Sequence, residues 1–259
     1  MRKDFFDNKL MLSKFNDLQI YCGGETNCAM CANILEKKNT LKYKSQWFAP
    51  DFGAITEGYL LLFSNRCVPS VGYFNKIEFS DIEESIKKTR KILSEKYDCK
   101  VIFFEHGAGD DMAKKAGCCV AHAHIHAVPV PSDINLDLFE KDLEAYVGEL
   151  RKQKINKLQE LSKIVKKDSS YLLYINSDDE RFVFDIGEKQ IPSQMFRKYI
   201  SILPEIRKKN LNWLENNNIE GIENFTWDWR QFRPADRYNK TANYLFSEFK
   251  ERLYETNKR

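Results

Sequence analysis

No stretch of the sequence approaches the roughly 18 consecutive apolar residues that a membrane-spanning helix needs. The N-terminal stretch MRKDFFDNKLMLSKFNDLQIY is charged throughout and has no apolar signal core. From these two absences we expect a cytoplasmic protein with no membrane attachment.

The chain has no large excess of charge of either sign. Its 41 Lys and Arg nearly balance its 38 Asp and Glu, which gives a net charge of +3. A general nucleic-acid-binding protein would carry a strongly basic surface, so that class is excluded, whereas binding of a nucleotide-sized anion is not. A disulfide framework is not expected either. The 7 cysteines are odd in number and closely spaced, which suits metal ligands and reduced, buried thiols.

Internal repeats and low-complexity linkers are absent, and what remains is the composition of a soluble globular chain. Of its 259 residues, 42% are hydrophobic and 13% aromatic, which supplies a sizeable core. We expect an α+β fold with an antiparallel sheet and helices packed on it. A boundary near residue 150 would separate a first domain, 1–150, from a C-terminal α+β extension, 151–259, packed on it.

Hydrophobic periodicity places the elements. Strands are expected at 43–51, 59–65, 100–107, 120–130, 171–176 and 181–186. Helices are expected at 1–20, 80–97, from about 133 to 167, 191–203 and about 241–254. A capping box of Ser80 and Glu83 is predicted to open the second helix.

Histidine is scarce, with only 4 in the chain, yet three of them stand at alternate positions in CCVAHAHIHAVPV. In a strand, alternate side chains share one face, so His122, His124 and His126 would form a row while Ala123 and Ile125 pack on the other side. Three interpretations are open: hydrogen-bonded core histidines, a tridentate metal site, or acid–base and nucleophilic chemistry on a phosphate.

The stretch HAHIHAV, from His122 to Val128, resembles the histidine-triad (HIT) motif: three histidines at alternate positions followed by two apolar residues. The preceding ITEGYLLLFSNRCVPSVGYF is similar to the family segment in which Pro-Gly-His-Leu-Leu leads to a strand, a basic pair and a histidine. The resemblance covers roughly residues 20–135, about half of the chain.

The resemblance implies that His124 is a nucleophile toward the α-phosphorus of a nucleotide and that a nucleotidyl-histidine forms. His126 would hydrogen-bond the phosphate or assist proton transfer, and His122 would orient its neighbours or bind metal. The family's Gly-Gln-Ser-like stretch before the triad is replaced by Gly117-Cys118-Cys119. Backbone N–H groups at Gly117 and Cys119 can still donate to a phosphate, although two polar side chains are missing.

Cys28-x-x-Cys31 has the spacing of a zinc site, but one such pair alone is a weak signal. The resemblance implies that Cys67, which replaces an expected histidine, and His122 complete a structural zinc site. The alternative is four ordinary reduced residues.

Glu105 and His106 precede the glycine-containing loop before the triad. Either one is a candidate to touch the leaving group, and Glu105 is a candidate for a ribose hydroxyl. The alternative is a pair that caps the loop at the end of a strand.

The stretches IPSQMFRKYI and WDWRQFRP in the extension resemble segments of longer HIT-like phosphorylases and hydrolases. Gln194 at a helix N-terminus, and Arg197 and Arg230 as planar forks, are candidates to bind phosphate. Trp227 or Trp229 is a candidate to stack on a base. The alternative is core tryptophans and solvated arginines.

Together these patterns predict a hydrolase that cleaves a nucleotide phosphoanhydride or phosphoester, such as a dinucleoside polyphosphate or a nucleotide conjugate. A phosphorylase or nucleotidyltransferase would use the same intermediate with another acceptor. A non-catalytic nucleotide-binding module is the alternative from another class. Dimers are common in the family, so a homodimer is one candidate assembly, and coverage of the same surface by the extension is the alternative.

Overall fold

The structure is a computed structural model of the chain. It describes residues 28, 30–31, 39–109, 122–148, 151–165, 169–187, 189–216, 226–228 and 232–255. The helix expected over residues 1–20 lies outside these ranges.

Eight strands and several helices make up the described part of the chain. The strands are β1 (Leu41–Tyr43), β2 (Gln46–Pro50), β3 (Leu60–Ser64), β4 (Cys99–Gly107), β5 (His124–Pro131), β6 (Arg151–Ile155), β7 (Tyr171–Ile175) and β8 (Arg181–Asp185). The longer helices are α3 (Lys76–Tyr97), α4 (Leu136–Val147), α6 (Met195–Ile202), α7 (Pro204–Asn216) and α8 (Ala235–Tyr244). Shorter pieces are η2 (Val71–Tyr73), η4 (Leu158–Leu161), α5 (Ser162–Val165), η6 (Leu245–Phe249) and α9 (Lys250–Tyr254).

The strands form one sheet in the order β1-β2-β3-β5-β4-β7-β8-β6, and neighbours run antiparallel. The predicted α+β class with an antiparallel sheet is therefore confirmed. Strand β7 pairs with β4, so the segment after residue 150 extends the sheet of the first part. The division into two domains at residue 150 stays a prediction.

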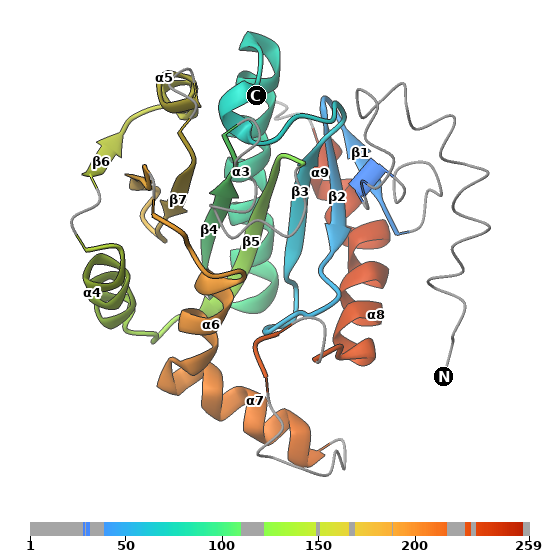
Figure 1. Cartoon of the computed structure of the whole chain (residues 1–259). Coiled ribbons are helices and arrows are strands. Elements are labelled where there is room, and N and C mark those ends of the chain that lie inside the picture. Colours follow the sequence, from blue (N-terminus) through green and yellow to red (C-terminus); the bar gives the residue numbers. More distant parts are fainter. Residues whose placement is uncertain are drawn as a thin grey trace, which may run out of the picture.

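Each face of the sheet carries its own core. Helix α3 covers one face together with η6 and α9, whose Leu245, Phe249 and Leu253 are buried there. Helices α4, α6 and α7 pack toward the other face, and Phe104 and Phe196 meet in that core. Figure 1 shows the C-terminal helices α8 and α9, in red, beside β1 and β2. The face under α6 is the one that receives the histidines.

Helix α3 begins earlier than the sequence predicted. Its N-cap is Asn75, whose side chain accepts from the backbone of Glu78 while the Glu78 carboxylate accepts from the Asn75 N–H. The predicted box of Ser80 and Glu83 is therefore wrong, because an equivalent box five residues upstream adds a further helical turn. The apolar side chains of Ile82, Ile86 and Leu93 are buried against the sheet.

The helix predicted from about 133 to 167 is also corrected. Helix α4 ends at Gly148, whose φ of +58° lies in the left-handed region, and the chain then forms β6. The strand residues Arg151, Lys152 and Lys154 resemble a solvated helix in sequence, which explains the error. Helix α7 was not predicted, and α8 begins at Ala235, before the expected start near Thr241.

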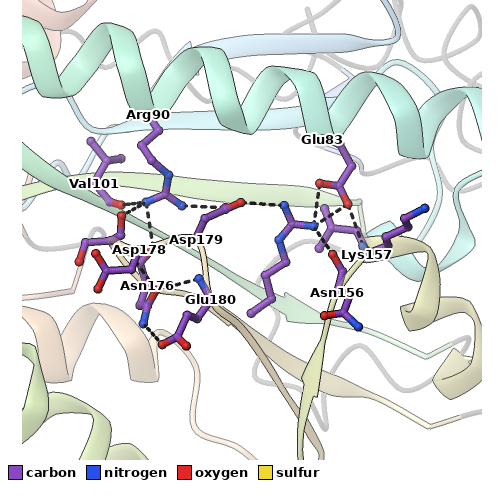
Figure 2. A network of polar contacts seen from close by, with 12 residues as sticks. Glu83, Arg90, Val101, Asn156, Lys157, Asn176, Asp178, Asp179 and Glu180 are labelled. Atoms are coloured by element: carbon purple, nitrogen blue, oxygen red, sulfur yellow. Dashed lines mark hydrogen bonds and ion pairs between the residues drawn. The ribbon is translucent and has the colours of Figure 1, made fainter.

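A polar network joins α3 to the hairpin of β7 and β8 (Figure 2). Arg90 donates to the carbonyls of Val101 and Asn176, and its guanidinium also pairs with Asp179. Arg181 bonds both Glu83 and Asp179. The network anchors the three strands after residue 150 to the long helix on the back of the sheet.

Among the described residues, no helix combines the length and apolar character that a membrane span requires.

Candidate active site and metal centre

Strand β5 begins at His124, so it places His124 and His126 on the α6 face as alternation predicts, whereas His122 lies before the strand rather than within it. His124 pairs with Phe63 of β3, and His126 pairs with Phe104 of β4, so all four side chains share this face. Ile125 points into the opposite core. The two imidazoles lie together, with ring centroids 5.0 Å apart.

His124 has a defined tautomer. Its Nδ1 lies 2.6 Å from the main-chain carbonyl oxygen of His122, which can only accept, so Nδ1 carries the proton. Burial lowers the pKa of His124 and the hydrogen bond offsets this in part. The ring is therefore neutral at pH 7 and its Nε2 keeps a lone pair. Within the described ranges, no hydrogen-bond partner occupies that atom.

The ring of His126 is held by two contacts. Its Nδ1 lies 2.8 Å from the phenol oxygen of Tyr59, and its ring stacks on Phe104 at 4.4 Å. Burial, followed by the charges of His124 and Arg197, lowers the pKa of His126 well below its usual range. A neutral imidazole beside the lone pair of His124 can donate a hydrogen bond to the same bound group.

The side chain of His122 lies in a cluster with the cysteines. Its Nδ1 lies 3.2 Å from Cys28 Sγ and 3.5 Å from Cys31 Sγ, and with Cys67 the ligand atoms all fall within 4.8 Å of one another. Zinc bonds of about 2.0–2.3 Å give a tetrahedron with edges of roughly 3.5–3.8 Å, so the set fits zinc. Nε2 of His122 donates to the Ser64 carbonyl at 2.8 Å, which leaves Nδ1 facing the thiols.

The lowered pKa of Cys28 also favours the binding of a metal cation by the cluster. Contacts with the thiols of Cys31 and then Cys67 lower the pKa of Cys28, and the nearby His122 acts in the same direction. A thiolate is the form that binds metal. The four residues predicted as ligands are thus brought together, as a structural metal site requires.

Glu105 does not belong to the site. Neighbours on a strand point to opposite faces, and the Glu105 carboxylate lies on the α3 side, where it accepts from Tyr171 Oη at 2.6 Å and from the Val71 N–H at 2.9 Å. Its predicted contact with a ribose or leaving group is therefore corrected to a structural role. His106 points to the triad face, with its ring 5.2 Å from that of Phe196.

Arg197 is buried rather than open to a phosphate. Its guanidinium donates to Asp51 at 2.9 Å, to the Trp227 carbonyl at 3.3 Å and to the carbonyl of Gly53, and its carbon lies 5.3 Å from the centroid of the Tyr59 ring. The predicted phosphate fork is corrected, because these donors are already used within the protein. Arg197 packs against Tyr59, and the Tyr59 hydroxyl forms a hydrogen bond with His126.

Of the other residues predicted to bind substrate, the structure describes Gln194 and Trp227. Gln194 is buried before α6 and donates to Asp228 at 3.1 Å, so its amide faces a carboxylate. Trp227 is half-buried and lies under Lys198. Gly117, Cys119 and Arg230 lie outside the described residues, so their predicted roles stay predictions.

Sequence reasoning missed Tyr59 and Asp51. Tyr59 stands in the stretch ITEGYLLLF at the place where the similar family segment has a histidine, so the signal for it was present. Asp51 gave no comparable signal, because its importance depends on an ion pair with Arg197, far away in sequence.

Comparison with known proteins adds little to these contacts. No protein-family model matches the chain, and no curated protein matches it. Among solved structures, the chain is similar to a Hit-like protein involved in cell-cycle regulation from Bartonella henselae, determined with an unknown ligand. The match has 14% identity and a TM-score of 0.34, and covers 56% of this chain and 97% of the other. A likeness at this level carries no argument about function, which must come from the site itself.

Proposed function

We propose that the chain is a nucleotidyl-transfer enzyme of the histidine-triad type, which hydrolyses a phosphoanhydride or phosphoester of a nucleotide through a nucleotidyl group on His124. The observation that carries the proposal is the hydrogen bond from His124 Nδ1 to the His122 carbonyl. It directs an unprotonated Nε2 away from the backbone, as a nucleophile requires.

The reaction consists of two displacements at phosphorus, and water is its only co-reactant. The lone pair of His124 Nε2 forms a bond to the α-phosphorus, the bond from phosphorus to the leaving oxygen breaks, and that oxygen takes the electron pair. His126 donates a hydrogen bond to the phosphoryl oxygens as charge develops there. Water then forms a bond to phosphorus, the N–P bond breaks, its electron pair returns to Nε2, and the proton of water passes to solvent.

We further propose that the Cys28, Cys31, Cys67 and His122 cluster holds a structural zinc ion. A zinc ion in this donor set cross-links segments distant in sequence and supplies no nucleophile. The chain's own contribution is to fix His122, whose carbonyl orients the ring of His124. The predicted substrates are dinucleoside polyphosphates and nucleotide conjugates.

Product analysis tests the proposal. A dinucleoside polyphosphate labelled at the α-phosphorus is incubated with the zinc-loaded protein, with and without inorganic phosphate. Release of nucleoside monophosphate in both reactions supports a hydrolase. Conversion to nucleoside diphosphate only with phosphate replaces hydrolysis with phosphorolysis, and binding without any product replaces both with a nucleotide-binding module.

A trapping experiment tests the intermediate. Rapid denaturation during turnover is expected to leave an acid-labile label on the wild-type chain and none on His124→Ala. Label that persists on His124→Ala overturns the assignment of the nucleophile.

A further inference from the structure

The hydrogen bond between Tyr59 and His126 fixes more than the orientation of the ring. Tyr59 is fully buried, and its phenol oxygen lies 2.8 Å from His126 Nδ1. A phenol has one hydrogen to donate, whereas a neutral imidazole carries a proton on either of two nitrogens. The direction of this one bond therefore decides which nitrogen of His126 faces a bound phosphate as a donor.

The surroundings of the phenol decide that direction. Besides His126, the guanidinium of Arg197 contacts the Tyr59 hydroxyl and lies over the Tyr59 ring. The Asp51 carboxylate acts on the hydroxyl through its charge, and its own hydrogen bonds come from Arg197 and the Gly53 N–H. A guanidinium only donates, so within the described residues Nδ1 of His126 is the acceptor left for the phenolic hydrogen. The reverse arrangement would leave that hydrogen buried without an acceptor, which disfavours it by roughly 10- to 100-fold.

Arg197 is itself held in place. Asp51 accepts from its guanidinium at 2.9 Å and also accepts from the Gly53 N–H at 2.8 Å, while the Gly53 carbonyl takes another Arg197 donor. The two side chains are almost fully buried, so the pair is shielded from water. This loop and α6 therefore hold a cation against Tyr59, with the guanidinium carbon 5.3 Å from the centroid of its ring.

We propose that Tyr59 and Arg197 are positioning residues that hold the ring proton of His126 on Nε2, so that His124 and His126 present opposite tautomers to one substrate. His124 offers a lone pair at Nε2 and His126 offers an N–H at Nε2. Burial keeps the pKa of Tyr59 far above its usual range, so the phenol stays a donor throughout the neutral pH range. The catalytic meaning of this arrangement rests on the proposed function, whereas the arrangement itself does not.

Opposite tautomers match the two requirements of the reaction. The attacking atom needs a lone pair, and the oxygens that gain charge need a donor already in place. If both rings carried the proton on Nδ1, two lone pairs would face the anionic phosphate and repel it. If both carried it on Nε2, no nucleophile would remain. The His122 carbonyl holds the proton of His124 on Nδ1, and the Tyr59 hydroxyl holds the proton of His126 on Nε2, so the two rings take the two required tautomers.

The test uses zinc-loaded protein labelled with ¹⁵N in its 4 histidines. Long-range ¹H–¹⁵N spectra distinguish a protonated ring nitrogen from an unprotonated one. Wild type is expected to show His126 protonated on Nε2 and His124 protonated on Nδ1, and protonation of His126 on Nδ1 would overturn the proposal. Single substitutions of each histidine assign the signals.

Tyr59→Phe removes only the hydroxyl from a well-packed ring. The ring pattern of His126 is then expected to become a mixture of tautomers, and kcat to fall about 5- to 10-fold with KM nearly unchanged. An unchanged His126 pattern in Tyr59→Phe overturns the proposal. Tyr174→Phe is the matched control, because Tyr174 is buried in the same core but donates to Glu140, away from the histidines.

The two proposals fail in different ways. If nucleotides are not turned over but the wild-type tautomers are as expected and change in Tyr59→Phe, the proposed function fails and the inference stands. If turnover proceeds through a His124 adduct while His126 carries its proton on Nδ1, the inference fails and the proposed function stands.

Discussion

His124 donates a 2.6 Å hydrogen bond from Nδ1 to the main-chain carbonyl of His122. The side chain of His122 in turn meets Cys28 and Cys31 in the metal cluster. His122 thus contacts the proposed metal site through its ring and the proposed nucleophile through its backbone carbonyl.

Backbone hydrogen bonds connect the chain next to His122 with the segment that carries Cys67. The N–H of Ala123 donates to the Val68 carbonyl at 2.6 Å, and the N–H of Ser64 donates to the Ala123 carbonyl at 3.1 Å. A metal ion bound to Cys67 and His122 would therefore hold the two sides of this junction together. We expect metal loss to disturb the nucleophile as well as the fold.

Substitution of Cys67 tests the metal centre. Purified wild type is expected to contain about one zinc per chain by elemental analysis. Cys67→His keeps a zinc-binding donor and should retain the ion, whereas Cys67→Ser should lose most of it and unfold at lower temperature. Cys99→Ser is the control, since Cys99 is a half-buried free cysteine outside the cluster. Metal-free wild type from a careful preparation would contradict the assignment.

Substitution of His124 and substitution of His126 should lower kcat by different factors if the proposed function holds. His124→Ala removes the atom that bonds to phosphorus, so kcat should fall by about 10⁴-fold or more while nucleotide binding remains largely intact. His126→Ala removes a donor to the phosphoryl oxygens and should cost about 10²- to 10³-fold in kcat. Steady-state kinetics and equilibrium binding of the same substrate separate the two effects. Wild-type turnover by His124→Ala would be incompatible with covalent catalysis at this residue.

The sequence predicted those parts of the site that follow from alternation along one strand or from the metal-binding capacity of single residues. Alternation along β5 placed His124 and His126 on one face, and the replacement of a histidine by Cys67 kept a zinc-binding donor. The same alternation could have assigned Glu105, because it is the neighbour of His106 and must point to the other face.

The errors have physical causes. Strand β6 is an edge strand whose Lys and Arg side chains are typical of a solvated helix, so only its pairing with β8 identifies it. Arg197 resembled a phosphate ligand because sequence does not reveal Asp51, which lies far away along the chain and satisfies the buried charge. Long-range ion pairs of this kind carry no local signal.

Removal of Asp51 should be severe because it leaves the Arg197 cation buried without its carboxylate. Asp51→Ala is expected to lower the free energy of unfolding by about 3–5 kcal/mol. Glu144→Ala, which breaks the exposed pair with Lys152, should change it by less than about 1 kcal/mol. Urea unfolding of the zinc-loaded proteins measures both values. Equal effects of the two substitutions would show that Arg197 does not depend on Asp51.

Helix α3 ends in a strained residue that glycine would relieve. Asp98 has φ +45° and ψ +57°, is exposed, and donates its N–H to the Ser94 carbonyl. Asp98→Gly should stabilise the protein by about 0.5–1 kcal/mol, or roughly 1–3 °C in Tm, since glycine adopts this conformation without a Cβ penalty. Asp98→Ala keeps a Cβ and should give no gain. A calorimetric comparison of the three proteins tests the prediction, and equal gains in both variants would contradict it.

Glu105 should make stability depend on pH in a direction opposite to that of an ordinary surface carboxylate. Burial raises its pKa to about 7, although hydrogen bonds from Tyr171 and the Val71 N–H partly offset this, and the unfolded value is 4.5. Between these values the folded state binds more protons than the unfolded state, so the Glu105 contribution to stability falls as pH rises.

Glu105→Gln cannot titrate, so the free energy of unfolding of wild type minus that of the variant isolates this contribution. The difference is expected to fall by up to about 3 kcal/mol between pH 4.5 and pH 8. Tyr171→Phe removes one donor to the carboxylate and should move the upper end of the window to higher pH. Urea unfolding of the zinc-loaded proteins at several pH values measures both effects. A difference between wild type and Glu105→Gln that stays constant with pH would show that the pKa of Glu105 does not rise on folding.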